Sequence, residues 1–182
     1  MKIIFVQGKG GVGKSTLAFL FAIALDRVGK SISIRDLDPQ ESLTAWLNDT
    51  ENFKFSDNGD ITIIDTPPRI DDPAVLKAIS EADRIIIPTT PSPAELATTR
   101  HSATVIANHM NPNAKAFVVF NRVKKISTYG KNLATMAENL PIPAARSHLS
   151  EREVYKHALL DGWNALDAAA KDEITSLALE IQ

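Results

Sequence analysis

Five short apolar runs recur along the chain, and each has the length of a β-strand. Most of them are nearly continuous, which is typical of strands that are buried on both faces of a parallel sheet. The run Ser31–Ile34 instead alternates polar and apolar residues, which also indicates a strand. The predicted strands are residues 3–6, 31–34, 61–64, 84–88 and 116–120.

Helices are predicted between these runs. The longest apolar stretch, from Ser15 to Val28, is followed by Gly29, as is typical of a helix that ends at a left-handed residue. Ser92 and Glu95 form the pattern of a capping box around Pro93. Further helices are predicted from Asp72 to about Ser80, from the Ser92 box to about His109, over residues 128–139, after a capping pattern at Ser150 and Glu153, and from about Ala168.

The alternation of strands and helices predicts the fold class. It is typical of an α/β protein with a mostly parallel, twisted sheet and helices on both faces. The sequence has no internal repeat, low-complexity tract or linker, and 182 residues suffice for one sizeable core. We therefore expect a single domain over residues 1–182.

The composition narrows the class of protein further. The chain is 44% hydrophobic and 23% charged, as in ordinary soluble proteins. No apolar segment is long enough to span a bilayer, and the first predicted strand leaves no room for a signal peptide. These features predict a cytoplasmic protein. The chain has no cysteine, which excludes disulfides and thiolate-bound metal clusters.

The clearest chemical motif lies between the first predicted strand and the first predicted helix. Residues 8–15 read Gly-Lys-Gly-Gly-Val-Gly-Lys-Ser and match the phosphate-binding pattern G-x-x-x-x-G-K-[ST]. Glycines allow backbone N–H groups to point at a phosphate, and the helix N-terminus adds partial positive charge. We expect Lys14 at the β- and γ-phosphates and the Ser15 hydroxyl at Mg²⁺.

Carboxylates follow two of the predicted strands. Asp36 and Asp38 come after the second strand, which Pro39 ends, and Asp65 directly follows the third. Open parallel sheets bind ligands at the carboxyl ends of their strands, so these groups are candidates for the same site. Asp38 and Pro39 also suit the start of a helix, and both interpretations can hold together.

A second lysine, Lys9, makes the motif more specific. With Lys14 it gives Lys-Gly-Gly-Val-Gly-Lys-Ser, which resembles the deviant Walker A motif of the ParA/MinD family of ATPases. Residues 36–40 resemble the A′ motif of that family, Asp65 its Walker B acid, and residues 66–68 its switch segment. The resemblance covers nearly the whole chain, is strongest to small ParF-like ParA plasmid proteins, and implies a P-loop NTPase fold of the SIMIBI type.

The resemblance also implies ATP and Mg²⁺ as ligands and gives each motif residue a role. Lys9 would cross an ATP-sandwiched homodimer, Lys14 would neutralise phosphoryl oxygens, and Asp38 would orient the attacking water. These three are the expected catalytic residues. The expected ligand-binding residues are Ser15, Asp36 and Asp65 for the metal, Gly8, Lys9, Gly10, Gly11, Val12, Gly13, Lys14, Ser15 and Thr16 for the phosphates, and Asn121 and Arg122 for the base.

The charge distribution bears on nucleic-acid binding. The net charge is −2, so the chain as a whole is not an electrostatic DNA binder. Residues 121–157 nevertheless carry seven basic and three acidic residues, a net charge of +4 against −6 elsewhere. We expect non-specific DNA contacts in the dimer, although a solvated mixed face is the simpler alternative. The candidates are Lys124, Lys125, Lys131, Arg146, Arg152 and Lys156.

Several related functions are excluded. Without cysteine the chain cannot be a nitrogenase iron protein, an iron–sulfur carrier or an arsenite-pump ATPase. Residues 173–182 lack the basic face of a MinD-like membrane helix, so no membrane partner is expected. Tyr129 and Tyr155 are too few for the tyrosine cluster of the related bacterial kinases.

The expected function is therefore ATP-dependent DNA partition, with a nucleoid-associated dimer whose hydrolysis is stimulated by a ParB-like centromere-binding or adaptor protein. Two alternatives stay open. A ParA-like ATPase that positions a protein complex would use the same chemistry on another cargo. A metabolic ATP-dependent ligase of the same superfamily would need neither Lys9 nor the basic region.

Overall fold

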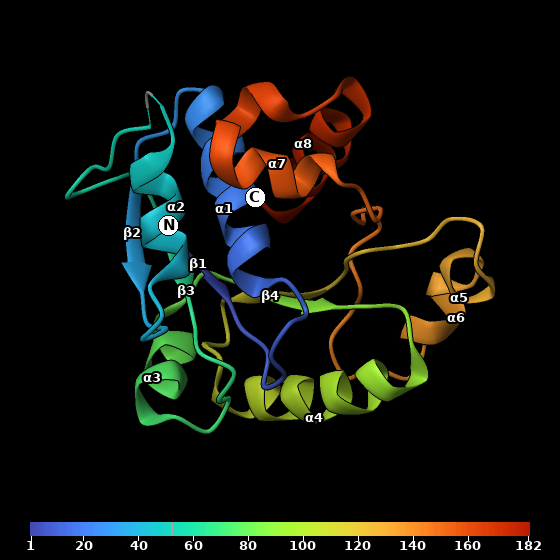
Figure 1. Ribbon diagram of the computed structural model, residues 1–182. Helices are drawn as coiled ribbons and strands as arrows, with labels where there is room; N and C mark the ends of the chain where they lie inside the picture. The colour runs from blue at the N-terminus through green and yellow to red at the C-terminus, as the bar shows by residue number, and fades with distance from the viewer. Residues whose placement is uncertain (52) are drawn as a thin grey trace.

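The computed structural model describes residues 1–51 and 53–182 (Figure 1). Its centre is a five-stranded sheet in the order β2-β3-β1-β4-β5, and every neighbouring pair is parallel. The predicted fold class is therefore confirmed. The strands are β1 (Lys2–Phe5), β2 (Ile32–Asp36), β3 (Ile61–Asp65), β4 (Arg84–Thr89) and β5 (Lys115–Phe120).

Helices cover both faces of the sheet, and Figure 1 shows the two layers above and below the strands. Alternate residues of β1 explain this arrangement, because successive strand side chains point to opposite faces. Ile3 and Phe5 pack in one core, while Ile4 and Val6, the residue directly after β1, pack in the other. One layer contains α1 (Lys14–Arg27), α2 (Ser42–Asp49), α7 (Val154–Asp161), the 3₁₀-helix η1 (Gly162–Ala165) and α8 (Ala168–Ile181), and the other contains α3 (Pro73–Glu81) and α4 (Pro93–His109).

Helix α1 is the central element of the first layer. Every residue from Leu17 to Leu25 is buried. The helix packs against the sheet and against α2, α7 and α8, which explains why its sequence is apolar on all sides. The Phe21 ring meets Phe5 of β1 edge to face, with 5.2 Å between ring centroids. This packing fixes the start of α1, and with it the phosphate loop, over the end of β1.

Three local predictions need correction. The helix expected over residues 128–139 is two short helices, α5 (Thr128–Lys131) and α6 (Leu133–Ala137). Asn132 separates them, and its side chain bonds back to the Thr128 carbonyl. Ser150 does not cap α7, because its hydroxyl donates to Glu173 instead. The helix start suggested at Asp38 and Pro39 is misplaced, because α2 begins at Ser42 and its N-cap residue is Glu41.

One of the two hydrogen bonds of the capping box predicted at Ser92 and Glu95 is confirmed. The Ser92 hydroxyl accepts a hydrogen bond from the Glu95 N–H at the start of α4. The Glu95 carboxylate does not return to this turn, because it pairs with Lys9. Among the described residues, no helix has both the length and the apolar character needed to cross a membrane.

Candidate active site

The phosphate loop connects β1 to α1 and depends on two glycines in the left-handed region. Gly11 has φ +79° and Gly13 has φ +94°, conformations that side chains rarely adopt. A Cβ atom at Gly13 would also lie 2.4 Å from Asn121 Nδ2. Gly13 is the residue before α1, so the loop ends at the positive end of a long buried helix.

A residue that the sequence analysis missed holds the other end of the loop. Gln7 is buried, and its side chain donates to the Pro88 carbonyl at 3.2 Å and to Thr99 Oγ1 at 3.1 Å. Its Oε1 accepts the Gly8 N–H at 2.9 Å and the Ser102 hydroxyl. The first residue of the loop is therefore tied to β4 and α4. The only sequence signal was a polar residue directly after a buried strand.

The loop forms one side of an open cleft of about 720 Å³. The remaining walls come from residues 37–40 after β2, residues 67–69 after β3, Trp46 of α2, and Arg122 after β5. Apart from Trp46, these segments follow the carboxyl ends of parallel strands, where ligands bind in open α/β sheets. The structure thus brings the phosphate loop, Asp38 and the switch segment to one place.

Lys14 is buried within this arrangement. Its Nζ donates to the Lys9 carbonyl at 3.4 Å, so the ammonium lies against the loop itself. Burial lowers the pKa of Lys14, while the carboxylates of Asp65 and Asp38 oppose this shift. The two aspartates are thus near enough to influence Lys14 electrostatically, and the site contains a desolvated cation that suits an anionic ligand.

Asp65 lies at the end of β3 and is fully buried. Its Oδ1 accepts the Thr66 N–H at 2.9 Å, whereas its buried Oδ2 has no hydrogen-bond partner among the described residues. Burial raises the pKa of Asp65 to about 6, with a further increase from Asp36, although Ser15, Thr66 and Lys14 act in the opposite direction. An unpartnered carboxylate oxygen near a serine hydroxyl is a donor set that suits Mg²⁺.

Asp36 and Asp38 have different surroundings. Asp36 Oδ1 accepts the Asp38 N–H at 3.1 Å, and its Oδ2 accepts both the N–H and the hydroxyl of Thr44 at 3.3 Å. Asp36 therefore anchors the loop after β2 to the first turn of α2. Asp38 lines the cleft, and its Oδ1 accepts the Gln40 N–H at 3.0 Å. The carboxylate that faces the ligand space is thus Asp38.

Lys9 lies on the outer part of the phosphate loop. Its ammonium pairs with Glu95 Oε1 at 2.5 Å, and 43% of its side chain is exposed. Glu95 belongs to the first turn of α4, 86 residues away in sequence. In a single subunit, this lysine is therefore held by α4 of its own chain.

The residues expected at the base occupy the end of β5. Asn121 Nδ2 donates to the Val12 carbonyl at 3.0 Å, and its Oδ1 accepts the Arg122 N–H. Asn121 thus supports the phosphate loop directly. Arg122 adopts φ +53° and borders both the main cleft and a second hollow of about 230 Å³.

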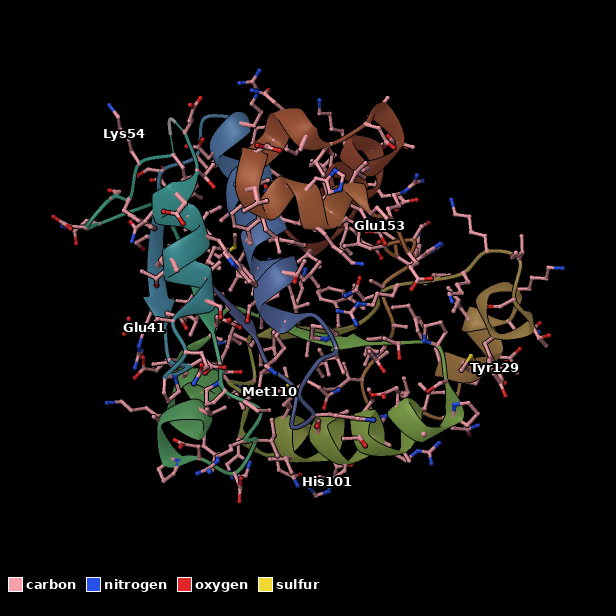
Figure 2. The ribbon with its side chains drawn as sticks, in the orientation of Figure 1. Glu41, Lys54, His101, Met110, Tyr129 and Glu153 are labelled. Carbon is pink, nitrogen blue, oxygen red and sulfur yellow. The ribbon has the colours of Figure 1, made fainter. Side chains whose placement is uncertain are left out.

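The candidate DNA-binding residues do not form one uniform surface. Lys124, Lys125 and Lys131 are exposed near α5, a region that Tyr129 marks in Figure 2. Arg152 is different, because its side chain is only 24% exposed and pairs with Glu173 at 2.9 Å. The remaining candidates are exposed Arg146, whose backbone N–H donates to Glu180, and Lys156, which pairs with Glu153 at 2.9 Å.

This parallel sheet, with a glycine loop between β1 and α1 and acids at the ends of β2 and β3, defines a P-loop nucleotide-binding protein. Residues 3–162 match the CbiA family, the CobQ/CobB/MinD/ParA nucleotide binding domain. The chain belongs to this family. The resemblance to ParA/MinD proteins that the loop and acidic motifs suggested is thereby confirmed.

Similar proteins extend over nearly the whole chain. Maintenance of carboxysome distribution protein A of Halothiobacillus neapolitanus is 27% identical over 200 residues, which cover 95% of this chain and 92% of that protein. Protein ParA of Rhizobium radiobacter is 27% identical over 202 residues, covering 98% and 90%. A plasmid partition protein of Borrelia burgdorferi B31 bound to AMPPNP has a TM-score of 0.73 at 21% identity, covering 99% and 97%. At this identity, the structural likeness shows the fold.

Proposed function

We propose that the protein is an ATPase that binds ATP and Mg²⁺ in the cleft, forms a face-to-face dimer over two nucleotides, and hydrolyses ATP. The observation that carries the proposal is the convergence of the phosphate loop, Lys14 and Asp38 on one cleft, with Asp65 buried near Lys14. Membership of a nucleotide-binding family and the AMPPNP complex of the Borrelia protein support it.

The proposed chemistry is in-line attack of water on the γ-phosphate. Loop N–H groups and Lys14 bind the phosphate oxygens and neutralise their charge. Asp38 Oδ2 accepts a hydrogen bond from the water and orients it, while Gln40 holds the other carboxylate oxygen. When bound, Mg²⁺ neutralises charge on the β- and γ-phosphates.

Two further aspartates, Asp65 and Asp36, complete the proposed site. Asp65 would hold the metal together with the Ser15 hydroxyl, and the unpartnered Asp65 Oδ2 supports this role. Asp36 is proposed mainly as a positioning residue, because its bonds to Asp38 and Thr44 fix the loop that carries the water-orienting group. Its expected contribution to the metal shell stays a prediction.

Replacing Asp38 with alanine should separate ATP binding from hydrolysis. The variant keeps the loop and Lys14, so Mg·ATP affinity should stay within about threefold of wild type while turnover falls by about 100-fold or more, the usual effect of losing a positioned proton acceptor. Phosphate release and calorimetry measure the two quantities. A normal turnover rate would contradict the water-orienting role of Asp38.

Asp65→Asn is the matched variant for this test, because it removes a carboxylate charge from the same site. It should raise the Mg²⁺ concentration needed for half-maximal ATP binding, whereas Asp38→Ala should leave that concentration unchanged. If Asp38→Ala instead raised this Mg²⁺ concentration and Asp65→Asn left it unchanged, the metal-binding role of Asp65 would be wrong.

The cargo of the proposed dimer is DNA, in the manner of partition ATPases. The names of the Rhizobium and Borrelia proteins support this choice. A second candidate is the positioning of a protein complex, which the carboxysome distribution relative favours. The proposed partner in the first case is a ParB-like centromere-binding protein, and in the second an adaptor on the complex. Stimulation of hydrolysis by one or the other, supplied in purified form, distinguishes them.

We further propose that the dimer binds DNA non-specifically through the exposed lysines near α5. Lys131 forms no ion pair within residues 1–51 and 53–182, and Lys124 and its partner Glu151 are both exposed, at 65% and 50%. Exposed ion pairs of this kind are weak and exchange readily for phosphate. Arg152 is not part of this proposed surface, because Glu173 and Asp167 hold its guanidinium.

The double variant Lys124→Ala/Lys131→Ala should weaken ATP-dependent DNA binding and leave ATP affinity unchanged. Two phosphate contacts contribute about 2 to the slope of log affinity against log salt, so the slope should fall by about that amount. Fluorescence anisotropy with duplexes of unrelated sequence measures this. Lys30→Ala/Lys77→Ala removes the same charge elsewhere and is the control. Equal DNA affinity in both double variants would exclude the proposed surface.

A further inference from the structure

One carboxylate of the last helix collects an unusual number of hydrogen bonds. Glu173 of α8 accepts from the backbone N–H and the hydroxyl of Ser150, at 2.9 and 2.7 Å. It also accepts from Arg152 Nη2 at 2.9 Å and from the Tyr155 hydroxyl at 2.8 Å. Its side chain is 13% exposed. Three residues of one short segment are thus held by a single, mostly buried carboxylate from another element.

The same segment is the wall of the second hollow. Ser150, Arg152 and Tyr155 line this space of about 230 Å³, and Leu17 and Leu20 of α1 also border it. Glu173 contacts these lining residues but does not line the hollow itself. Figure 2 marks the region through Glu153, beside the first turn of α7. The shape of the hollow therefore depends on how firmly Glu173 holds residues 150–155.

The hollow continues from the phosphate site. Thr16 and Arg122 border both this hollow and the main cleft. Thr16 directly follows the loop residues that would bind phosphate, so a nucleotide with its phosphates on the loop can extend past Thr16 into the hollow. Four leucines line the hollow together with the Tyr155 ring, and the other lining residues are polar or charged. Apolar surface for a base beside hydrogen-bonding groups for a ribose suits a nucleoside.

Hydrogen bonds keep the Glu173 carboxylate ionised. Burial alone would raise the pKa of Glu173, but the hydrogen bonds from Arg152, Ser150 and Tyr155 lower it to about 2. The hydrogen bond to Glu173 raises the pKa of Arg152, and burial raises the pKa of Tyr155, with a further contribution from Glu173. The cluster thus stays intact across the neutral pH range.

We propose that Glu173 is a positioning residue for the nucleoside: it holds residues 150–155 so that the hollow beside the phosphate site is preformed for the base and ribose. This proposal rests on the proposed nucleotide-binding function and adds a role for the C-terminal helix. Preformed sites bind more tightly because less side-chain and loop ordering remains to occur on binding. Glu173 should therefore affect the nucleoside part of the ligand and not the triphosphate part.

The test compares two ligands and two glutamates. Magnesium ATP and magnesium tripolyphosphate are titrated by calorimetry into the wild-type protein, Glu173→Gln and Glu180→Gln. Glu180 lies on the same helix and accepts the Arg146 and Ser147 N–H groups at 2.7 and 2.8 Å, outside the hollow. Both variants lose a helix carboxylate that anchors a neighbouring segment, so a general loss of stability should affect them alike.

Glu173→Gln should bind ATP about tenfold more weakly than wild type, as expected when a preformed wall becomes mobile, with tripolyphosphate affinity unchanged. Glu180→Gln should leave both affinities unchanged. Equal ATP affinity in the two variants would overturn the proposal, and so would an equal loss for both ligands in Glu173→Gln. If wild type binds neither ligand, the proposed nucleotide site itself is wrong.

A second variant guards against misfolding of Glu173→Gln. Tyr155→Phe removes one hydrogen bond to Glu173 and keeps the ring that packs in the wall. It should lower ATP affinity in the same direction but by less, again without an effect on tripolyphosphate. Wild-type affinity for ATP in this variant, with Glu173→Gln unfolded, would also count against the proposal.

Discussion

Replacing Lys14 with alanine should abolish measurable ATP binding. Lys14 is the buried cation of the phosphate loop, and its Nζ already lies against the loop carbonyl of Lys9. Each charge-assisted hydrogen bond to phosphate contributes about 1.5–3 kcal/mol, so losing two of them weakens binding by about 100-fold or more. Buried Asp65 would in addition lose a nearby positive charge. The effect should be larger than that of any other single substitution in the cleft.

Calorimetric titration with Mg·ATP measures this effect directly. Lys30→Ala is the matched control, because it removes an exposed lysine just beyond the other end of α1. The control should bind ATP like wild type. Wild-type affinity in Lys14→Ala would show that residues 8–15 do not bind the phosphates, and the proposed function would fail with them.

Replacing Lys9 with alanine should have its largest effect on the dimer and on hydrolysis. Lys9 is not needed to bind phosphate within its own subunit, where Lys14 is already buried in the loop. The half-exposed Lys9 side chain pairs with Glu95 of the same chain, so it must leave this partner to reach a second subunit. Lys9→Ala should therefore keep ATP affinity within about threefold, lose stimulated hydrolysis, and weaken ATP-dependent dimerisation by about tenfold or more, as the loss of a charge-assisted contact requires.

Glu95→Gln is the informative companion variant. It removes the partner that holds Lys9 in the single subunit and leaves Lys9 itself in place. ATP-dependent dimerisation, followed by light scattering, should be unchanged or stronger in Glu95→Gln and weaker in Lys9→Ala. Equal dimerisation of wild type and Lys9→Ala would make Lys9 an ordinary surface lysine and would favour a metabolic ATP-dependent enzyme.

Much of the fold was predictable because its signals are local. Apolar runs indicate the strands. The phosphate loop is a motif of consecutive residues, and its glycines at positions 11 and 13 are required because the backbone there has positive φ. The carboxylates could be placed near the loop because parallel strands end at one edge of a sheet. The start of α2 was misplaced because the Glu41 side chain does not cap it, and the Thr44 N–H donates instead to Asp36, which precedes the helix.

The remaining features depend on pairings between distant residues, which no sequence pattern encodes. The ion pair of Lys9 with Glu95 joins positions 86 residues apart. The pair of Arg152 with Glu173 joins positions 21 residues apart. Counting charges along residues 121–157 therefore placed Arg152 on a DNA surface, although its guanidinium holds α8 in place. Asn121, expected at the base, borders the hollow that is proposed for the base, and its amide also supports the loop at Val12, a pairing that the sequence did not reveal.

We propose that Lys9 of one subunit completes the site of the other, as the resemblance to ParA/MinD proteins implies, and mixing two variants that each lack one group tests this most directly. In a mixed dimer of Lys9→Ala and Asp38→Ala, the subunit that lacks Lys9 retains Asp38 and receives Lys9 from its partner. One of the two sites is then complete. The other site lacks both groups.

The measurement is steady-state phosphate release after equal amounts of the two variants are mixed before ATP is added. Random pairing makes about half of the dimers mixed, each with one complete site of two, so hydrolysis should recover to about a quarter of the wild-type rate. If Lys9 instead acts in its own subunit, the mixture will be no more active than the sum of the two variants measured alone, and the dimer mechanism is contradicted.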